Sequence, residues 1–176
     1  MTLRLAGPLL LVGAGKMGGA LLEGWLQQGL EPAHVFVRDP NPPLEIASLI
    51  ARHGIGTEAR AELPAKLSVI LLAVKPQIVD AVLPSVAPVI EKETVVLSIV
   101  AGRTLASLAR YLPKGAAIVR AMLWRLPRKV SRGTLPRAIG RYQQILAPSR
   151  PGHHPASGTT SNARGCDCYA LRRLIR

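Results

Sequence analysis

Short apolar runs alternate with longer amphipathic segments over the first 122 residues of this chain. Strand-length apolar runs occupy residues 8–12, 34–37, 68–74, 94–99 and 116–119, and helical spacing of apolar positions occupies residues 16–28, 44–53, 77–90 and 104–111. Continuous apolar runs are typical of strands that are covered on both faces. Strand, helix and strand at this spacing indicate parallel βαβ units, because parallel neighbours need a crossover connection. We therefore predict an α/β fold, a doubly wound parallel sheet of about six strands within residues 8–121.

The alternation ends at Met122. Beyond it arginines follow no helical or strand period, and only residues 138–146 and 169–175 have the composition for helical turns. Prolines interrupt the segment repeatedly, at Pro127, Pro136, Pro148, Pro151 and Pro155. So little apolar surface cannot offset the entropy lost on ordering, which predicts a disordered or irregular tail. The predicted organisation is a dinucleotide-binding domain at 1–122 and an Arg/Pro-rich tail at 123–176 that forms no domain.

Charge divides the chain at the same place. Of the formal net charge of +13, residues 1–122 carry +3 and residues 123–176 carry +10. A basic segment can hold nucleic acid through its phosphates, although this one offers few aromatic side chains for stacking. Its histidines and cysteines (His153, His154, Cys166 and Cys168) match no standard zinc spacing, so no metal site is predicted.

Three further features bear on location. Residues 1–122 contain no cysteine, which favours a reducing compartment and hence the cytoplasm. The apolar start of the chain leads into a glycine motif without the cleavage site of a signal peptide. No apolar stretch reaches the ~18 residues that a membrane span needs. We expect a cytoplasmic protein without a membrane partner.

The glycine motif stands between the first strand and the first helix, and it reads Gly13-Ala14-Gly15-Lys16-Met17-Gly18. In this context Gly13 permits a tight turn, Gly15 lets a pyrophosphate approach the backbone, and Gly18 lets the helix pack on the strand. The helix N-terminus then offers free N–H groups to the phosphates. This predicts a Rossmann-type domain with NADP or NAD as cofactor. The alternative is a glycine-rich turn that holds no ligand.

The end of the second strand bears on the choice between the two cofactors. Asp39 follows Gly18 by 21 positions, near the place where an acidic residue binds ribose hydroxyls. Arg38 beside it is suited to a 2′-phosphate, and Asn41 could bond to either group. Asp39 is equally well explained as a turn former before Pro40. The preference for NAD or NADP stays open at this point.

A third candidate segment, Ala73-Val74-Lys75-Pro76, ends the central apolar run. Ligands of such sheets bind outside the carboxyl ends of the strands, so this loop is expected to face the cofactor. Pro76 keeps Lys75 out of helical geometry. The alternative for Lys75 is an ordinary solvated loop lysine.

Together these segments resemble the N-terminal domain of the pyrroline-5-carboxylate reductase family. The resemblance rests on VGAGKMGGALLEGW, LLAVKPQ, VVLSIVAGRTL and IVRAM, and it runs from about Leu9 to Met122. It implies NAD(P)H binding through the glycine motif, the turn after the second strand and Ala73–Pro76. It also implies the reduction of 1-pyrroline-5-carboxylate, an imine, to proline.

The resemblance ends abruptly. Where the family continues with P-N-T-P-A, this chain has Leu123-Trp124-Arg125-Leu126-Pro127, and residues 123–176 do not match the helical domain that supplies the family's substrate pocket and dimer interface. The tail's composition is typical of GC-rich DNA read out of frame. We therefore expect a truncated reductase, impaired or inactive, monomeric or poorly associated, whose catalytic residues are unknown. Two alternatives stay open, a non-catalytic dinucleotide-binding module and a nucleic-acid binder that uses the basic tail.

Overall fold

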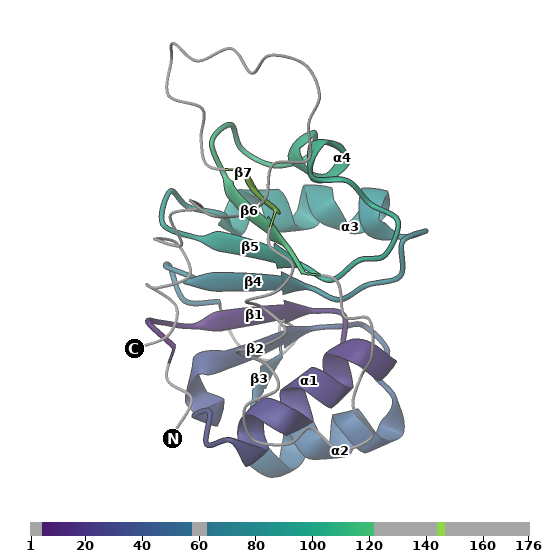
Figure 1. Ribbon diagram of the computed structural model, residues 1–176. Helices are drawn as coiled ribbons and strands as arrows, with labels where there is room; N and C mark the ends of the chain where they lie inside the picture. Colours follow the sequence, from purple (N-terminus) through teal and green to yellow (C-terminus); the bar gives the residue numbers. More distant parts are fainter. Residues whose placement is uncertain (1–4, 58–62, 122–143, 147–176) are drawn as a thin grey trace.

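The computed structural model describes residues 5–57, 63–121 and 144–146. Over these residues the strands form one sheet in the order β3-β2-β1-β4-β5-β6-β7, with β1 to β6 parallel and β7 antiparallel to β6 (Figure 1). The strands are β1 (Leu9–Val12), β2 (Val35–Arg38), β3 (Gly56–Thr57), β4 (Val69–Leu72), β5 (Val95–Ser98), β6 (Ala117–Arg120) and β7 (Gln144–Leu146). The helices are α1 (Lys16–Gln27), α2 (Leu44–His53), α3 (Val79–Val86) and α4 (Leu105–Ala109), with 3₁₀ turns η1 (Pro32–His34) and η2 (Ala87–Val89).

The predicted doubly wound parallel sheet is confirmed. Each apolar run contains a strand, and each amphipathic segment contains a helix. The segment 77–90 is shorter in its α-helical part than predicted, because it turns at Lys75–Ile78 before α3 and continues as η2 around Pro88. A proline has no N–H to donate, so the α-helical ladder cannot pass it unchanged. The two-residue strand β3 and the turn η1 were not predicted.

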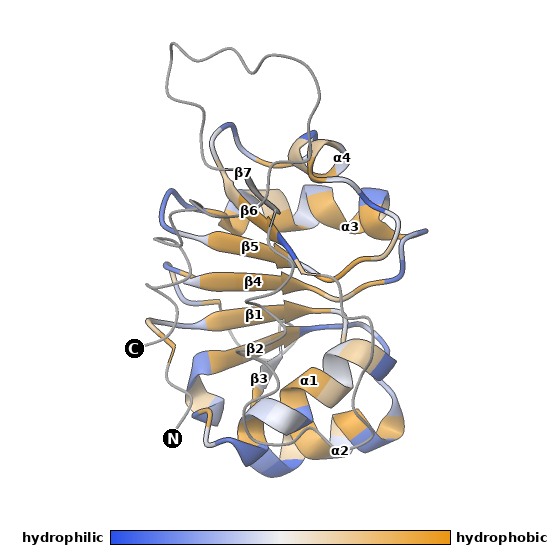
Figure 2. Ribbon diagram, viewed as in Figure 1, coloured by the Kyte–Doolittle hydropathy of each residue, from blue (hydrophilic) through white to orange (hydrophobic). Residues whose placement is uncertain are grey.

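The central strands are buried on both faces because a helical layer covers each face. Alternate residues of β1 point to opposite sides, so Leu9 and Leu11 join one apolar cluster while Leu10 and Val12 join the other. β4 divides its residues in the same way. Colouring by hydropathy shows the resulting apolar band across the sheet (Figure 2).

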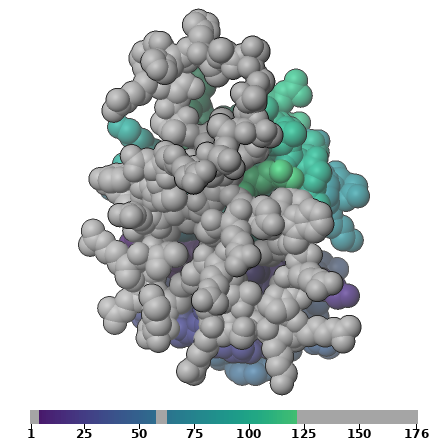
Figure 3. Space-filling view, in the orientation of Figure 1, coloured from purple at the N-terminus to yellow at the C-terminus, as the bar shows by residue number. Residues whose placement is uncertain are grey.

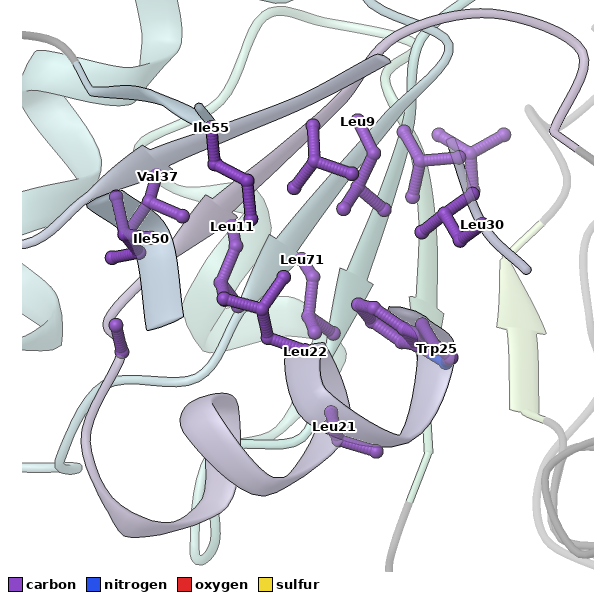
Figure 4. Close-up of a cluster of buried hydrophobic side chains, with 14 of the residues drawn as sticks. Leu9, Leu11, Leu21, Leu22, Trp25, Leu30, Val37, Ile50, Ile55 and Leu71 are labelled. Carbon is purple, nitrogen blue, oxygen red and sulfur yellow. The ribbon is translucent and has the colours of Figure 1, made fainter. Parts of the chain in front are cut away.

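Helices α1 and α2 cover one face of the sheet, and α3 and α4 cover the other. On the first face Leu22 and Trp25 of α1 pack toward Leu11 and Leu71 of the strands (Figure 4). The teal and green surface in the space-filling view belongs to the second half of the described domain (Figure 3). No described helix combines the length and apolar character that crossing a membrane requires.

β7 corrects one expectation about the tail. Residues 138–146 were predicted to allow helical turns, but Gln144–Leu146 is a strand that pairs with β6 from Ile118 to Arg120. The edge of a sheet offers unpaired backbone groups, which an extended segment can satisfy. All other expectations for residues 123–176 lie outside the described residues.

The chain reverses its direction of winding beside β1. It proceeds from β1 to β2 and β3 on one side, and then returns to β4 on the other side of β1. The loops that follow β1 and β4 therefore lie side by side at the carboxyl ends of the strands. The Ala73 N–H donates to the Val12 carbonyl at 2.8 Å. Such a switch point is where ligands of open α/β sheets bind.

Candidate functional site

Two of the three motif glycines are required by the fold itself. Gly13 has a φ of +91°, and a Cβ there would lie 2.8 Å from Val74 Cγ1 and 2.9 Å from the Ala73 carbonyl. A Cβ on Gly18 would overlap the Gly13 carbonyl oxygen. The loop after β1, the first turn of α1 and the start of the loop after β4 are therefore packed backbone to backbone.

Gly15 is different. Its backbone is extended (φ −66°), and a Cβ built on it would meet no described atom within 4 Å. It caps α1, which has no side-chain cap and no acidic residue in its first turn. The first N–H groups of a helix have no partner inside the helix. Packing among the described residues therefore does not explain a glycine at this position, whereas a phosphate approaching the backbone does.

Asp39 joins the turn after β2 to the glycine motif. Its Oδ2 accepts a hydrogen bond from the Ala14 N–H at 2.6 Å, and its Oδ1 accepts one from the Asn41 N–H at 2.9 Å. Ala14 is buried, while the Asn41 residue is exposed. Both oxygens of the carboxylate are thus anchored, one on the glycine loop and one on its own turn.

Arg38, the neighbour of Asp39, is directed elsewhere. Its Nη1 donates to the Ser85 carbonyl at 2.9 Å and approaches Ser85 Oγ at 3.4 Å. Ser85 lies in the last turn of α3, where carbonyls lack partners inside the helix and a cation is favourable. Of the two adjacent residues that the sequence offered for binding the ribose, Asp39 is thus hydrogen-bonded to the glycine loop and Arg38 to α3.

The segment Ala73–Pro76 lies beside the glycine motif, as its position after β4 requires. Ala73 and Val74 are half-buried against Gly18 and Gly13, whereas the Lys75 side chain is exposed. At the start of the motif's helix, Lys16 is also exposed and Met17 is half-buried. The structure thus brings together Gly13–Gly18, Asp39, Asn41 and Ala73–Pro76, and it directs the Arg38 side chain away from them.

Sequence reasoning missed the side chains that hold the loop after β4. Arg103, which follows β5, donates from Nη2 to the Pro76 carbonyl at 3.2 Å and forms an ion pair with Asp80 of α3. The hydrogen bond from Arg103 lowers the pKa of Asp80, with smaller contributions from Tyr111 and from the charges of Arg103 and Arg110, against an opposing effect of burial. These partners lie 23 and 27 positions from Arg103, so no local pattern could have indicated them.

Within the described residues, no cluster of three or more histidine, cysteine or acidic side chains could hold a metal ion. What the site offers instead is backbone N–H groups at a helix start, one anchored carboxylate and a loop with an exposed lysine. Backbone N–H groups at a helix start can bind a phosphate, and a carboxylate can accept hydrogen bonds from hydroxyl groups.

Known proteins resemble the same region. Over 113 residues the chain is 37% identical to pyrroline-5-carboxylate reductase of Escherichia coli, which covers 63% of this chain and 42% of that protein. Over 139 residues it is 31% identical to pyrroline-5-carboxylate reductase 3 of Xenopus laevis, covering 78% and 50%. The chain thus spans about two fifths to half of the length of these relatives, and its N-terminal part is similar to them.

Solved structures support the fold. The pyrroline-5-carboxylate reductase of Coxiella burnetii superposes with a TM-score of 0.56 at 23% identity, over 66% of this chain and 44% of that one. The pyrroline carboxylate reductase of Plasmodium falciparum, solved with NADP bound, gives a TM-score of 0.53 at 22% identity, over 69% and 43%. The family model described as NADP oxidoreductase, coenzyme F420-dependent, matches residues 9–102, more than half of the chain, and the chain belongs to this family.

Proposed function

We propose that residues 9–121 bind NADH or NADPH across the carboxyl ends of β1 and β4, and that they form the cofactor-binding part of a pyrroline-5-carboxylate reductase. The family match and the identity to curated reductases support this proposal. In it, Gly13–Gly18 receive the pyrophosphate, the turn Arg38–Asn41 lies at the ribose, and Ala73–Pro76 approach the nicotinamide end.

The observation that carries the proposal is the open space at Gly15. Gly13 and Gly18 would be needed in any tight turn of this shape, with or without a ligand. Gly15 is needed only if something outside the described chain approaches its backbone. The residues present therefore fit a bound dinucleotide, and they favour it over a glycine-rich turn without a ligand.

When bound, the reduced nicotinamide supplies a hydride to the carbon of the substrate's C=N bond, and a proton added to the nitrogen completes proline and leaves oxidised cofactor. The contribution of this chain is to bind and orient. The glycine loop fixes the phosphates, and the loop Ala73–Pro76, held by Arg103, sets one wall beside the reacting end. Orientation of bound reactants is a large part of enzymatic rate acceleration.

Turnover by this chain is proposed to be weak or absent. Leu123–Pro127 replace the family's P-N-T-P-A loop, and residues 123–176 carry no match to its helical domain. A chain that binds the cofactor without positioning the imine acts as a dinucleotide-binding module. A role of the basic segment in binding nucleic acid rests on residues outside the described part.

A titration of NADH and NADPH against the 176-residue protein, with cofactor fluorescence as the readout, tests the binding site. Gly15→Val should weaken binding by about tenfold or more, because a branched side chain fills the space where the phosphate approaches. Gly7→Val, at the other end of β1, adds the same side chain where a Cβ would meet only ordinary contacts at 3.4 Å. It should leave affinity unchanged. Equal affinity of wild type and Gly15→Val would show that the cofactor does not bind at this loop.

The same protein should oxidise NADH or NADPH far more slowly than ~10 per second, the ordinary enzyme range, when it is given 1-pyrroline-5-carboxylate. Turnover in that range would contradict the proposed impairment, while it would leave the proposed cofactor site intact.

A further inference from the structure

The turn after β2 distinguishes NADH from NADPH, which differ by a single phosphate on the adenosine ribose. In doubly wound folds an acidic residue near this turn accepts hydrogen bonds from the ribose 2′-hydroxyl, whereas an arginine accommodates the 2′-phosphate. The chain has both residue types side by side, as Arg38 and Asp39. Their geometry decides which of them is available to a ribose.

The Asp39 carboxylate is fixed at the site. One oxygen accepts from the Ala14 N–H at 2.6 Å, directly before Gly15, and the other accepts from the Asn41 N–H at 2.9 Å. An ionised carboxylate has about four acceptor positions, so each oxygen can still accept from a ribose hydroxyl. Two backbone hydrogen bonds keep the negative charge where it is, and a 2′-phosphate would add a charge of about −1.5 to −2 beside it.

The Arg38 guanidinium is held on the other helical layer. Its Nη1 bonds to the Ser85 carbonyl at 2.9 Å in the last turn of α3. α3 packs on the face of the sheet opposite α1, whose N-terminus borders the glycine loop. To reach a 2′-phosphate beside Asp39, Arg38 would have to give up its hydrogen bonds at the end of α3.

We propose that Asp39 makes this protein select NADH over NADPH. The proposal rests on the proposed dinucleotide site, and it adds the residue that sets cofactor choice. The anchored carboxylate binds the ribose diol of NADH and repels the extra phosphate of NADPH, while the adjacent arginine is hydrogen-bonded to Ser85 at the end of α3.

The test is the ratio of the two dissociation constants, measured by titrating the full chain separately with NADH and with NADPH at constant ionic strength. The dissociation constant of NADPH divided by that of NADH should be about ten or more for wild type, since like charges brought together cost affinity. Asp39→Ser, which removes the charge, should lower this ratio at least about fivefold by improving NADPH binding. Asp39→Asn keeps the side-chain shape and should change the ratio in the same direction.

The ratio separates selectivity from a purely structural role. If Asp39 only supported the glycine loop, its variants would weaken both cofactors equally and leave the ratio unchanged. Glu31→Gln removes one negative charge from the residue that caps η1, before β2 begins, on a side chain that is 68% exposed. This variant should leave the ratio unchanged. A wild-type ratio near one, or a preference for NADPH, would overturn the proposal. Failure of both cofactors to bind wild type would instead contradict the proposed function.

Discussion

The two halves of the proposed site are held in different ways. On one side the glycine-loop half, Gly13–Gly18 with the turn Arg38–Asn41, is fixed by backbone packing and by backbone hydrogen bonds to one carboxylate. On the other side the lysine-loop half, Ala73–Pro76 with Arg103 and Asp80, is held by a long side chain that reaches across from the loop after β5. Gly13 and Gly18 of the first half leave no room for a side chain, whereas the Pro76 end of the second half is held by Arg103, which also pairs with Asp80.

This difference has an energetic consequence. A Cβ that overlaps buried backbone cannot be relieved by rotating a side chain, so changes at Gly13 and Gly18 should affect the fold. The Arg103–Asp80 pair has side chains that are 24% and 46% exposed, and ion pairs of this kind contribute little to stability. Changes at Arg103 or Asp80 should therefore alter binding while they leave the fold intact.

The largest expected effect is on stability, and it contrasts two glycines of one motif. Gly18→Ala should lower the free energy of unfolding by about 3 kcal/mol or more, because its Cβ overlaps the Gly13 carbonyl oxygen. Gly15→Ala should stay within about 1 kcal/mol of wild type, since its Cβ meets no described atom. Denaturant unfolding of both variants measures this, and similar losses in the two would remove the distinction between fold glycines and the ligand glycine.

A smaller effect is expected from the lysine-loop half. Arg103→Ala should weaken NADH binding by about two- to fivefold with little change in unfolding, because the Pro76 carbonyl and Asp80 lose their shared partner. Lys114→Ala removes an exposed cation from the loop before β6, at the amino ends of the strands, and serves as the matched control. If both variants changed affinity equally, the effect would be one of net charge and not of loop position.

The smallest expected effect is a pH dependence from Asp80. Its pKa is lowered in the folded protein, chiefly by the hydrogen bond from Arg103, so its stabilising contribution is present above its unfolded pKa. That contribution is lost as pH falls through the folded pKa, below about 4. The Tm difference between wild type and Asp80→Asn should therefore shrink between pH 6 and pH 3 in calorimetric scans. A difference that grew toward acid would contradict the assigned ion pair.

The same contrast explains what the sequence could predict. The period of the apolar residues was sufficient for β1, β2, β4, β5 and β6, and the glycine spacing located the loop after β1 because each glycine signals a backbone constraint. The direction of Arg38 could not be predicted, since its partner Ser85 lies 47 positions away on another layer. The Arg103 contacts to Pro76 and Asp80 were missed for the same reason, and β3 is too short to show a period.

The central claim is that one ligand engages both halves at once, and hydrogen exchange with and without saturating NADH tests it most directly. In the described part of the chain α1 has no side-chain cap, so its first backbone amides lack a partner inside the helix. The loop after β4 lies beside them, at the carboxyl ends of the strands. NADH should slow exchange in both Gly13–Gly18 and Ala73–Gln77. Exchange should change little at residues 91–94, which precede β5 at the amino ends of the strands. Bound NADH with unchanged exchange in both loops, or with slowed exchange only in residues 123–176, would contradict the account.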